Sequence, residues 1–488
     1  MKHILGILII LCALSCTVPM TVKRTIDAYP DIFPDYTDIT IPPNIAPLNF
    51  KILTPHIDAR VEFSGRKGTY EFSTNNGKLY IPKSKWKSLL SENLGCEVKV
   101  TIYTKDDKEE WTVYKPFIMN VAEEKIDRWL AYRLIEPGYE SWFKMGIYQR
   151  NLETFKESAI FENKMTNYNC VNCHSFCMQN PKKMLFHLRA IYPGTIIING
   201  GLLEKLNTKT DSTISPFVYP SWHPSCKFIA FSTNTTKQIF HSNDKNRIEV
   251  YDEASDVIVY DVLKHEVFTS ALIFSKKAFE TFPTFSSDGR ILYFCSASAL
   301  PMPESYKQLK YSLCSITFDP ETRTFGKLVD TLYNARIGNC SASFPRVSPD
   351  GKYLLYSLSS YGNFSIWHKN ADLCLTDLTN KENINLDVVN SNDVESYHSW
   401  SNNSHWFVFS SRRIDGLYTC PFIAYLDKMG KPHKPFLLPQ KDVEFYKRLM
   451  KSYNIPEFLT GKVEYSSRKI AIRAMSDDFE SVKWKKDK

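Results

Sequence analysis

The sequence predicts a mainly β protein, and three observations support this fold class. Apolar and polar residues alternate along N-terminal segments, a strand–turn–strand motif recurs in the C-terminal half, and Gly- or Asn-containing turn signals separate the apolar runs. The hydrophobic fraction of 43% and the aromatic fraction of 14% are typical of a well-packed globular chain. The 488 residues are enough for two to four domains.

The charge pattern predicts no nucleic-acid partner. The net charge of +8 comes from 61 basic and 53 acidic residues spread along the whole chain, so no block concentrates a positive field.

Residues 1–16 are expected to be a lipoprotein signal peptide. Lys2 and His3 precede an apolar run, residues 4–14, that is too short to span a bilayer comfortably. The run ends in Ala-Leu-Ser-Cys at 13–16, which resembles a bacterial lipobox. The resemblance implies lipidation at Cys16 and a place in the bacterial cell envelope, anchored in the outer membrane and facing the periplasm. An ordinary signal peptide with an incidental cysteine is the alternative.

The N-terminal third divides into three expected segments. Residues 17–45, rich in Pro, Asp and Ile, are expected to form an extended tether. Period-two alternation predicts a small β-sandwich over 46–120 with a spacer or docking role. In 121–183 apolar residues at helical spacing (Ile126, Trp129, Leu130) and Pro/Gly turns predict a short helical or irregular segment.

A repeat determines the fold expected after that segment. Four stretches align, each a short strand, a tight turn and an apolar strand: 220–232, 283–294, 345–357 and 398–410. Asp288-Gly289 and Asp350-Gly351 supply the positive φ that such turns need. Each copy is followed by a β run that ends in Asp, so four strands per repeat predict a β-propeller. A large β-sandwich is the alternative.

The repeat resembles the TolB-type, WD-repeat-like propeller family. The family's Ser-Pro-Asp-Gly-Lys turn is intact only at 348–352, and the other copies depart from it. The resemblance covers 184–440, where a further partial blade over 184–205 gives five or six blades, and leaves 441–488 as a C-terminal extension. It implies an interaction scaffold that meets an envelope protein partner through a propeller face.

One motif carries chemistry, the Cys-Val-Asn-Cys-His run at 170–174. Two thiols three residues apart can add to the vinyl groups of one haem, and an adjacent imidazole can ligate its iron. Cys170, Cys173 and His174 therefore predict one covalent haem c. The candidates for a distal ligand are His187, Met178, Met184, Met145 and Met165.

Three alternatives to haem remain open. Cys170, Cys173 and Cys177 could hold zinc together with His174, the first two cysteines could form a thiol redox pair, or the cysteines are purely structural. Most of the eight cysteines outside the signal peptide, Cys16 and the motif lie in apolar runs and are expected to be buried free thiols.

Several other polar residues are candidates for a site. Arg189 could meet a haem propionate, and His223 and His398 are expected near the channel, more as structural hydrogen-bonding groups than as ligands. Arg412-Arg413 is expected in a solvated loop; a paired guanidinium site for a carboxylate or for a partner's acidic patch is the alternative. The acidic group of Glu249, Asp252, Glu253 and Asp256 is expected in an exposed loop, because its spacing does not match a calcium loop.

Two functions follow. The first is a lipid-anchored monohaem c-type protein that transfers electrons or senses a small ligand. The second is an interaction scaffold whose cysteine motif is structural or metal-binding. A serine peptidase is not expected, because no Gly-x-Ser-x-Gly elbow occurs and the 48 residues after Gln440 are too few for a hydrolase domain.

Overall fold

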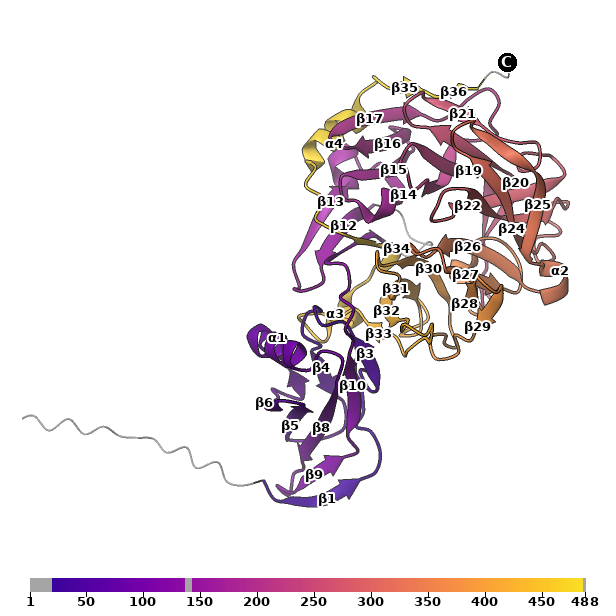
Figure 1. The fold of residues 1–488 in the computed structure, drawn as a ribbon. Helices are drawn as coiled ribbons and strands as arrows, with labels where there is room; N and C mark the ends of the chain where they lie inside the picture. Colours follow the sequence, from indigo (N-terminus) through magenta and orange to yellow (C-terminus); the bar gives the residue numbers. More distant parts are fainter. Residues whose placement is uncertain (1–19, 137–142, 486–488) are drawn as a thin grey trace, which may run out of the picture.

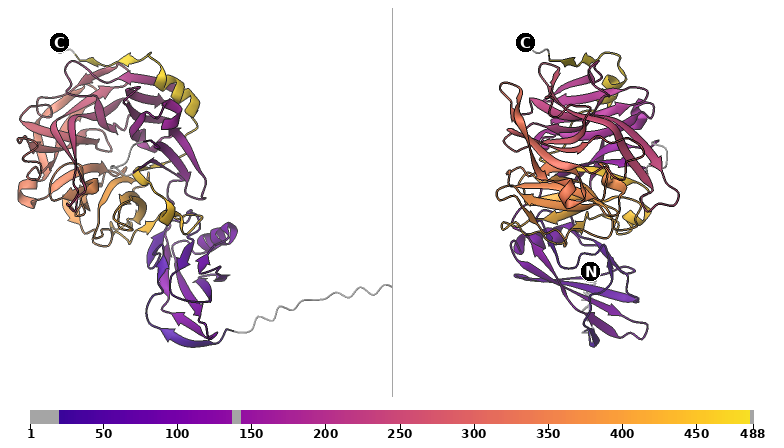
Figure 2. Two further views of the ribbon diagram at one scale, coloured as in Figure 1. Left: turned by 180° about the vertical axis from the view of Figure 1, so that it is seen from behind. Right: turned by 90° about the vertical axis from the view of Figure 1, so that its right-hand side faces the viewer.

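The computed structural model describes residues 20–136 and 143–485 and consists of a small N-terminal β domain below a ring of sheets (Figure 1). The signal peptide and Cys16 lie outside the described residues. Among the helices in the described ranges, none has the length and hydropathy needed to cross a membrane. Seen from the side, the ring is a thick disc with the N-terminal domain attached at one edge (Figure 2).

The N-terminal domain contains a seven-stranded sheet and a three-stranded sheet, in agreement with the β domain expected over 46–120. Helix α1 (Lys83–Glu92), which the alternation did not predict, buries Trp86 and Leu90 in the core. The strands are β1 (Val22–Ile26), β2 (Ile32–Phe33), β3 (Ile39–Ile41), β4 (Phe50–Ile52), β5 (Asp58–Gly65), β6 (Gly68–Ser73), β7 (Lys78–Leu79), β8 (Glu97–Lys105), β9 (Trp111–Tyr114) and β10 (Phe117–Val121).

The segment expected to be a tether belongs to this domain instead. Strand β1 pairs with β9 and β3 pairs with β10, both in parallel. Ile39 and Ile41 are buried, so apolar burial stabilises a segment whose Pro and Asp content suggested an extended linker.

The ring is a six-bladed propeller, which confirms the expected fold class. Each blade has four antiparallel strands, and the inner strand of each blade contacts the inner strand of the next all the way round. From the first blade to the sixth, inner strand first, the strands are β14 (Cys170–Phe176), β15 (Lys183–Arg189), β16 (Gly194–Asn199), β17 (Leu202–Asn207); β18 (Phe217–Trp222), β19 (Phe228–Phe240), β20 (Ile248–Asp261), β21 (Glu266–Phe268); β22 (Ala278–Phe285), β23 (Ile291–Ser298), β24 (Ser312–Asp319), β25 (Thr324–Tyr333); β26 (Ser341–Val347), β27 (Tyr353–Ser359), β28 (Asp372–Asp377), β29 (Glu382–Ile384); β30 (Glu395–Trp400), β31 (Trp406–Ser411), β32 (Cys420–Tyr425), β33 (Phe436–Leu437); and β34 (Ser452–Leu459), β11 (Trp129–Ile135), β12 (Gly146–Asn151), β13 (Glu157–Glu162).

The sixth blade corrects the expectation for 121–183. Trp129 and Leu130, expected on a helix, begin strand β11, and the segment goes on to supply three strands of this blade and the inner strand of the first. The inner strand of this blade, β34, comes from the expected C-terminal extension and pairs with β11. Short edge strands β35 (Glu480–Ser481) and β36 (Lys483–Trp484) join the first two blades. The short helices are α2 (Ala335–Gly338), α3 (Phe445–Arg448), α4 (Ser467–Met475), η1 (Asn163–Thr166), η2 (Cys177–Gln179) and η3 (Ser365–Trp367).

All six inner strands share one irregularity. Pairing with the next strand shifts register at the middle of the inner strand, and one residue there has positive φ. These residues are Cys173 (φ 43°), Tyr219 (49°), Phe282 (51°), Phe344 (54°), Tyr397 (43°) and Ile455 (51°). A bulge of this kind redirects side chains, and here it recurs at the wall of the central channel.

The repeat turns that lack Asp-Gly keep the same geometry. Asn403 replaces the Asp, and its Oδ1 accepts hydrogen bonds from the Ser401 hydroxyl and the His405 amide. Ser404 (φ 62°) stands where Gly289 and Gly351 stand in the intact copies.

Buried and partly buried polar contacts hold the N-terminal domain to the fifth blade and to the segment that follows it. The Tyr36 hydroxyl donates to the Leu437 carbonyl (3.3 Å), and the Trp406 indole donates to the Glu124 carbonyl (3.1 Å). Glu444 accepts from both Lys51 (3.0 Å) and Lys78 (2.6 Å).

Candidate functional site

The six residues with positive φ divide the propeller channel into two sites. Their aromatic members pack against one another in sequence with tilted rings, whose centroids are 4.4 Å apart for Tyr219–Phe282 and for Phe282–Phe344, and 5.0 Å apart for Phe344–Tyr397. We call these six residues the channel plug. A cavity of only about 30 Å³ lies within it, whereas larger spaces open on either side.

The larger space, here the channel cavity, has a volume of about 900 Å³. Its wall is strongly cationic, because five of its six charged side chains are basic: Arg133, Arg189, Lys209, Lys237 and Arg412, against Glu136. Aromatic side chains provide much of the remaining wall: Phe217, Tyr219, Phe364, Trp367, Tyr397 and Phe479. A cavity of this size and character suits a ligand with an apolar body and at least one negative charge.

The cations around the cavity differ in exposure and in the residues that they contact. The guanidinium carbon of Arg412 lies 3.3 Å from the Trp367 ring centroid, and Arg133 donates to the Asn172 side chain. Arg189 is exposed. The solvated loop expected at Arg412-Arg413 is therefore wrong: Arg412 is buried at the cavity, and Arg413 forms an ion pair with Glu395 (2.8 Å).

Both motif cysteines line the channel cavity as free thiols. Cys170 lies opposite Arg189 in the pairing of β14 with β15. Burial raises the pKa of the Cys170 thiol, which the nearby Arg133 partly offsets. The Sγ atom of Cys173 lies 3.4 Å from the Asn172 side-chain oxygen.

His174 does not share that cavity. It is 1% exposed and lines the small cavity within the plug, where burial, with a contribution from Arg133, lowers its pKa to about 3. His174 directly follows the plug residue of β14. The equivalent residue is His398 in the fifth blade and a proline in the other four inner strands: Pro220, Pro283, Pro345 and Pro456. Cys173-His174-Ser175-Phe176 is thus the first blade's copy of Tyr219-Pro220-Ser221-Trp222.

This placement tests the fit of a c-type haem. The thiols and the imidazole must act on one macrocycle. Here both thiols line the channel cavity, whereas His174 lines only the small cavity within the plug, which Cys173 borders as well. The residues at 170–174 do not fit haem attachment with His174 as the iron ligand while β14 keeps its pairing.

The expected distal ligands are also dispersed. His187 lines the channel cavity; its Nδ1 lies 2.8 Å from the Thr195 hydroxyl, and its Nε2 has no hydrogen-bond partner among the described residues. Met145 lines the same cavity, but its sulfur accepts from the Val171 amide. Met184 and Met165 pack in or against a hydrophobic core, and Met178 lies at the opposite mouth of the channel.

The disulfide pattern corrects two cysteine expectations. Cys177 and Cys226 form a disulfide, so neither is a free thiol. The expected zinc set of Cys170, Cys173, Cys177 and His174 is therefore excluded by the pairing of Cys177. Within the described residues, no group of three or more His, Cys, Asp or Glu side chains could hold a metal ion.

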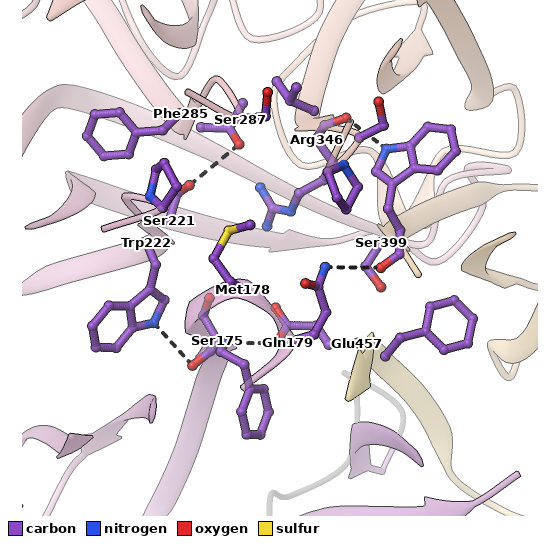
Figure 3. A pocket seen from close by; sticks show the side chains of 18 of the residues that line it. Ser175, Met178, Gln179, Ser221, Trp222, Phe285, Ser287, Arg346, Ser399 and Glu457 are labelled. Atoms are coloured by element: carbon purple, nitrogen blue, oxygen red, sulfur yellow. Dashed lines mark hydrogen bonds between the residues drawn. The ribbon is translucent and has the colours of Figure 1, made fainter. Parts of the chain in front are cut away.

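The space on the other side of the plug, here the mouth pocket, has a volume of about 130 Å³ (Figure 3). One residue from each blade, two positions after the plug residue, lines it: Ser175, Ser221, Thr284, Arg346, Ser399 and Glu457. Burial raises the pKa of Glu457 to about 8, although Arg346 opposes this effect. Met178 points into the pocket from η2 (Figure 3).

The acidic residues of β20 differ from expectation, whereas His223 and His398 match it. Glu249, Asp252 and Asp256 are buried on β20 rather than exposed in a loop. Asp252 accepts hydrogen bonds from Asn234 (2.6 Å) and Thr236 (2.8 Å), which accounts for its burial. His223 and His398 make structural hydrogen bonds, as expected: Nε2 lies 3.1 Å from the Gly289 carbonyl and 3.0 Å from the Leu355 carbonyl respectively.

Sequence reasoning missed Arg346 and Glu457 as site residues. The signal was present in the repeat, because both residues occupy a position that is Ser or Thr in the other four inner strands. A departure from a repeat at a channel-facing position marks a candidate site.

Comparison with known proteins shows likeness of fold alone. No protein-family model matches the chain, and no curated protein matches it. Among solved structures, the chain is similar to the β-propeller domain of the Trilobed protease from Pyrococcus furiosus, at 11% identity and TM-score 0.32, over 67% of this chain and 78% of that one. It is also similar to the periplasmic gluconolactonase of Pseudomonas aeruginosa, at 10% identity and TM-score 0.36, over 64% and 96%. A third similar structure is an oligogalacturonate lyase in complex with manganese, at 12% identity and TM-score 0.31, over 85% and 99%. The six four-stranded blades make the chain a β-propeller protein, and these likenesses assign it to no functional family.

Proposed function

We propose that this protein is a binding protein of the cell envelope that holds an anionic ligand with an apolar body in the channel cavity. One observation carries the proposal: five of the six charged side chains that line a cavity of about 900 Å³ are cations.

The electrostatics of the cavity favour an anion. Arg133 and Arg412 are buried, so solvent screens their charge less than that of surface cations. Arg189, Lys209 and Lys237 are exposed and extend the positive field towards solvent, where it can steer an incoming anion. The aromatic wall then supplies apolar contact for the body of the ligand.

A matched pair of probes tests the proposal. 8-Anilinonaphthalene-1-sulfonate and neutral N-phenyl-1-naphthylamine share an aromatic body and differ in charge. We expect the sulfonate to bind more tightly, and the Arg189→Gln, Lys209→Gln double variant to weaken its binding about tenfold, as expected for two lost charge contacts. Fluorescence titration at low salt measures both constants.

The matched control removes two exposed cations elsewhere. The Lys327→Gln, Arg336→Gln double variant has the same change in net charge but lies outside the cavity lining. Equal affinity for the two probes, or equal weakening in both double variants, would contradict a cationic binding cavity.

An envelope location is part of the proposal. The Cys177–Cys226 disulfide supports an oxidising compartment, where such bonds persist. Lipidation at Cys16 is tested by metabolic labelling with a radioactive fatty acid: we expect label in the wild type and none in Cys16→Ser. A labelled Cys16→Ser variant would rule out Cys16 as the anchor.

Haem is the second candidate ligand, favoured because Cys170, Cys173 and His187 line the same cavity as three arginines. The test is a pyridine haemochrome spectrum of protein made in a host with cytochrome c maturation machinery. A covalent haem would survive acid–acetone extraction, and Cys170→Ser, Cys173→Ser would abolish it. Protein that stays colourless in that host removes this candidate and leaves the anionic-ligand proposal standing.

A further inference from the structure

The mouth pocket is chemically distinct from the channel cavity. The two lie on opposite sides of the plug, and the mouth pocket gathers a guanidinium and a carboxyl group with four hydroxyl groups, one from each blade. Its outer wall is aromatic, with Trp222 and Trp400. We infer that the mouth pocket is a second binding site, for a small carboxylate held by Arg346.

Arg346 is positioned to receive an anion. Figure 3 shows its side chain extending into the middle of the pocket beside Met178. Among the described residues its guanidinium makes one hydrogen bond, from Nη1 to the carbonyl of its neighbour Pro345 (3.0 Å). The planar guanidinium therefore keeps donors for a carboxylate, which it can bind in a bidentate manner.

The hydroxyl groups complete the polar lining. Ser399 donates to the Pro456 carbonyl (2.8 Å), while Ser221 has only a long contact with Thr284 (3.5 Å). The Ser221 hydroxyl is thus a second donor that a ligand can recruit.

The size of the pocket selects a small ligand. A volume of about 130 Å³ is roughly ten times the minimum that holds one water molecule. Acetate, succinate or the end of a peptide fits this description, and all three present the same carboxylate.

Glu457 makes binding depend on pH. It lies with Arg346 from β26, His174 from β14 and His398 from β30, and burial lowers the pKa of both histidines to about 3. Both imidazoles are neutral above pH 5, so Glu457 is the group that titrates near neutrality. Below its pKa of about 8 the carboxyl is neutral and Arg346 is uncompensated; above it, the carboxylate cancels the charge that attracts the ligand. Affinity should therefore fall as pH rises through about 8.

Calorimetric titration of the full-length protein with acetate, succinate and acetamide tests the inference. At pH 6.5 we expect both acids to bind and acetamide, the neutral isostere, not to bind. Arg346→Gln should weaken acetate about 10- to 100-fold, the range expected when a hydrogen-bonded charge is lost, whereas Arg336→Gln, an exposed arginine elsewhere, should leave it unchanged. Wild-type affinity should fall between pH 7 and pH 9, and Glu457→Gln should remove that fall.

A peptide pair identifies the source of the carboxylate. Triglycine that binds more tightly than acetate, with no binding of its C-terminal amide, indicates a peptide terminus, and equal affinities indicate a free acid; both outcomes support the site. Acetate that fails to bind the wild type, or that binds folded Arg346→Gln equally well, overturns it. If Arg346→Gln does not fold, the pH series of wild type and Glu457→Gln decides, because identical profiles contradict the assignment. The probes of the channel cavity do not test this pocket, so each proposal can fail alone.

Discussion

Strand β14 and the other five inner strands share a backbone bulge but carry different side chains at it. Each has a register shift and a residue with positive φ at the channel. In β14 that residue is Cys173, followed by His174, whereas in β18 it is Tyr219, followed by Pro220. The comparison teaches that a short motif read as a cofactor signature can also be one divergent copy of a structural repeat.

The largest expected effect on stability comes from removing the Cys177–Cys226 disulfide, which follows the inner strand of the first blade. The Cys177–Cys226 disulfide links residues 49 apart in the sequence and ties the end of β14 to the second blade. Cys226→Ser should lower the free energy of unfolding by about 4 kcal/mol in the chain-entropy model. Urea unfolding of both proteins measures this difference, and a loss well below 1 kcal/mol would show that the blades hold together without the bond.

The two inner strands that carry histidine, β14 and β30, should make the stability of the protein depend on pH. Burial lowers the pKa of His174 and of His398 to about 3, below the value near 6.5 expected in the unfolded chain. Unfolding therefore takes up protons below pH 6.5, and stability falls as pH decreases from 6.5 towards 3. At pH 4 each histidine should lower the free energy of unfolding by up to about 3 kcal/mol.

The measurement is urea unfolding at pH 7 and pH 4. His174→Pro should retain more of its stability at pH 4 than the wild type does. Equal losses would show that His174 is not held neutral in the folded chain.

A smaller effect should come from restoring the repeat at Asn403. The Asn403 amide group donates to the Lys125 carbonyl (2.7 Å), which aspartate could not do. Asn403→Asp should therefore destabilise the protein by about 1 kcal/mol, as measured by urea unfolding. An unchanged midpoint would mean that this contact contributes nothing to stability.

The smallest effect should be that of His174→Pro at pH 7. Because four equivalent positions carry proline in the same bulge, we expect the variant to fold with a thermal midpoint within a few degrees of the wild type. Unfolded His174→Pro would show that β14 is not equivalent to its counterparts, which circular dichroism would detect.

The sequence alone predicted the blades that keep an Asp-Gly turn. Asp288-Gly289 and Asp350-Gly351 revealed two blades directly, and the runs from Met184 to Lys205 became β15, β16 and β17 as expected. The strands that form the sixth blade were not predicted, because they come from both ends of the propeller sequence and no local period marks them. The cysteine motif was assigned its partners from spacing alone, and spacing does not show that Cys170 lines the channel cavity while His174 lines only the small cavity within the plug. The channel cavity was missed because its wall draws single residues from distant segments, such as Arg133 and Arg412.

The pairing of β34 with β11 has a consequence for how this protein is made. A polypeptide that emerges from the ribosome with its N-terminus first exposes β11 long before Ser452–Leu459 is synthesised. Until then β11 is the bare edge of a three-stranded sixth blade, a state prone to pairing with other chains. Chaperones and proteases that act on the growing chain would meet this incomplete blade, and a stop codon before residue 452 would make that state permanent.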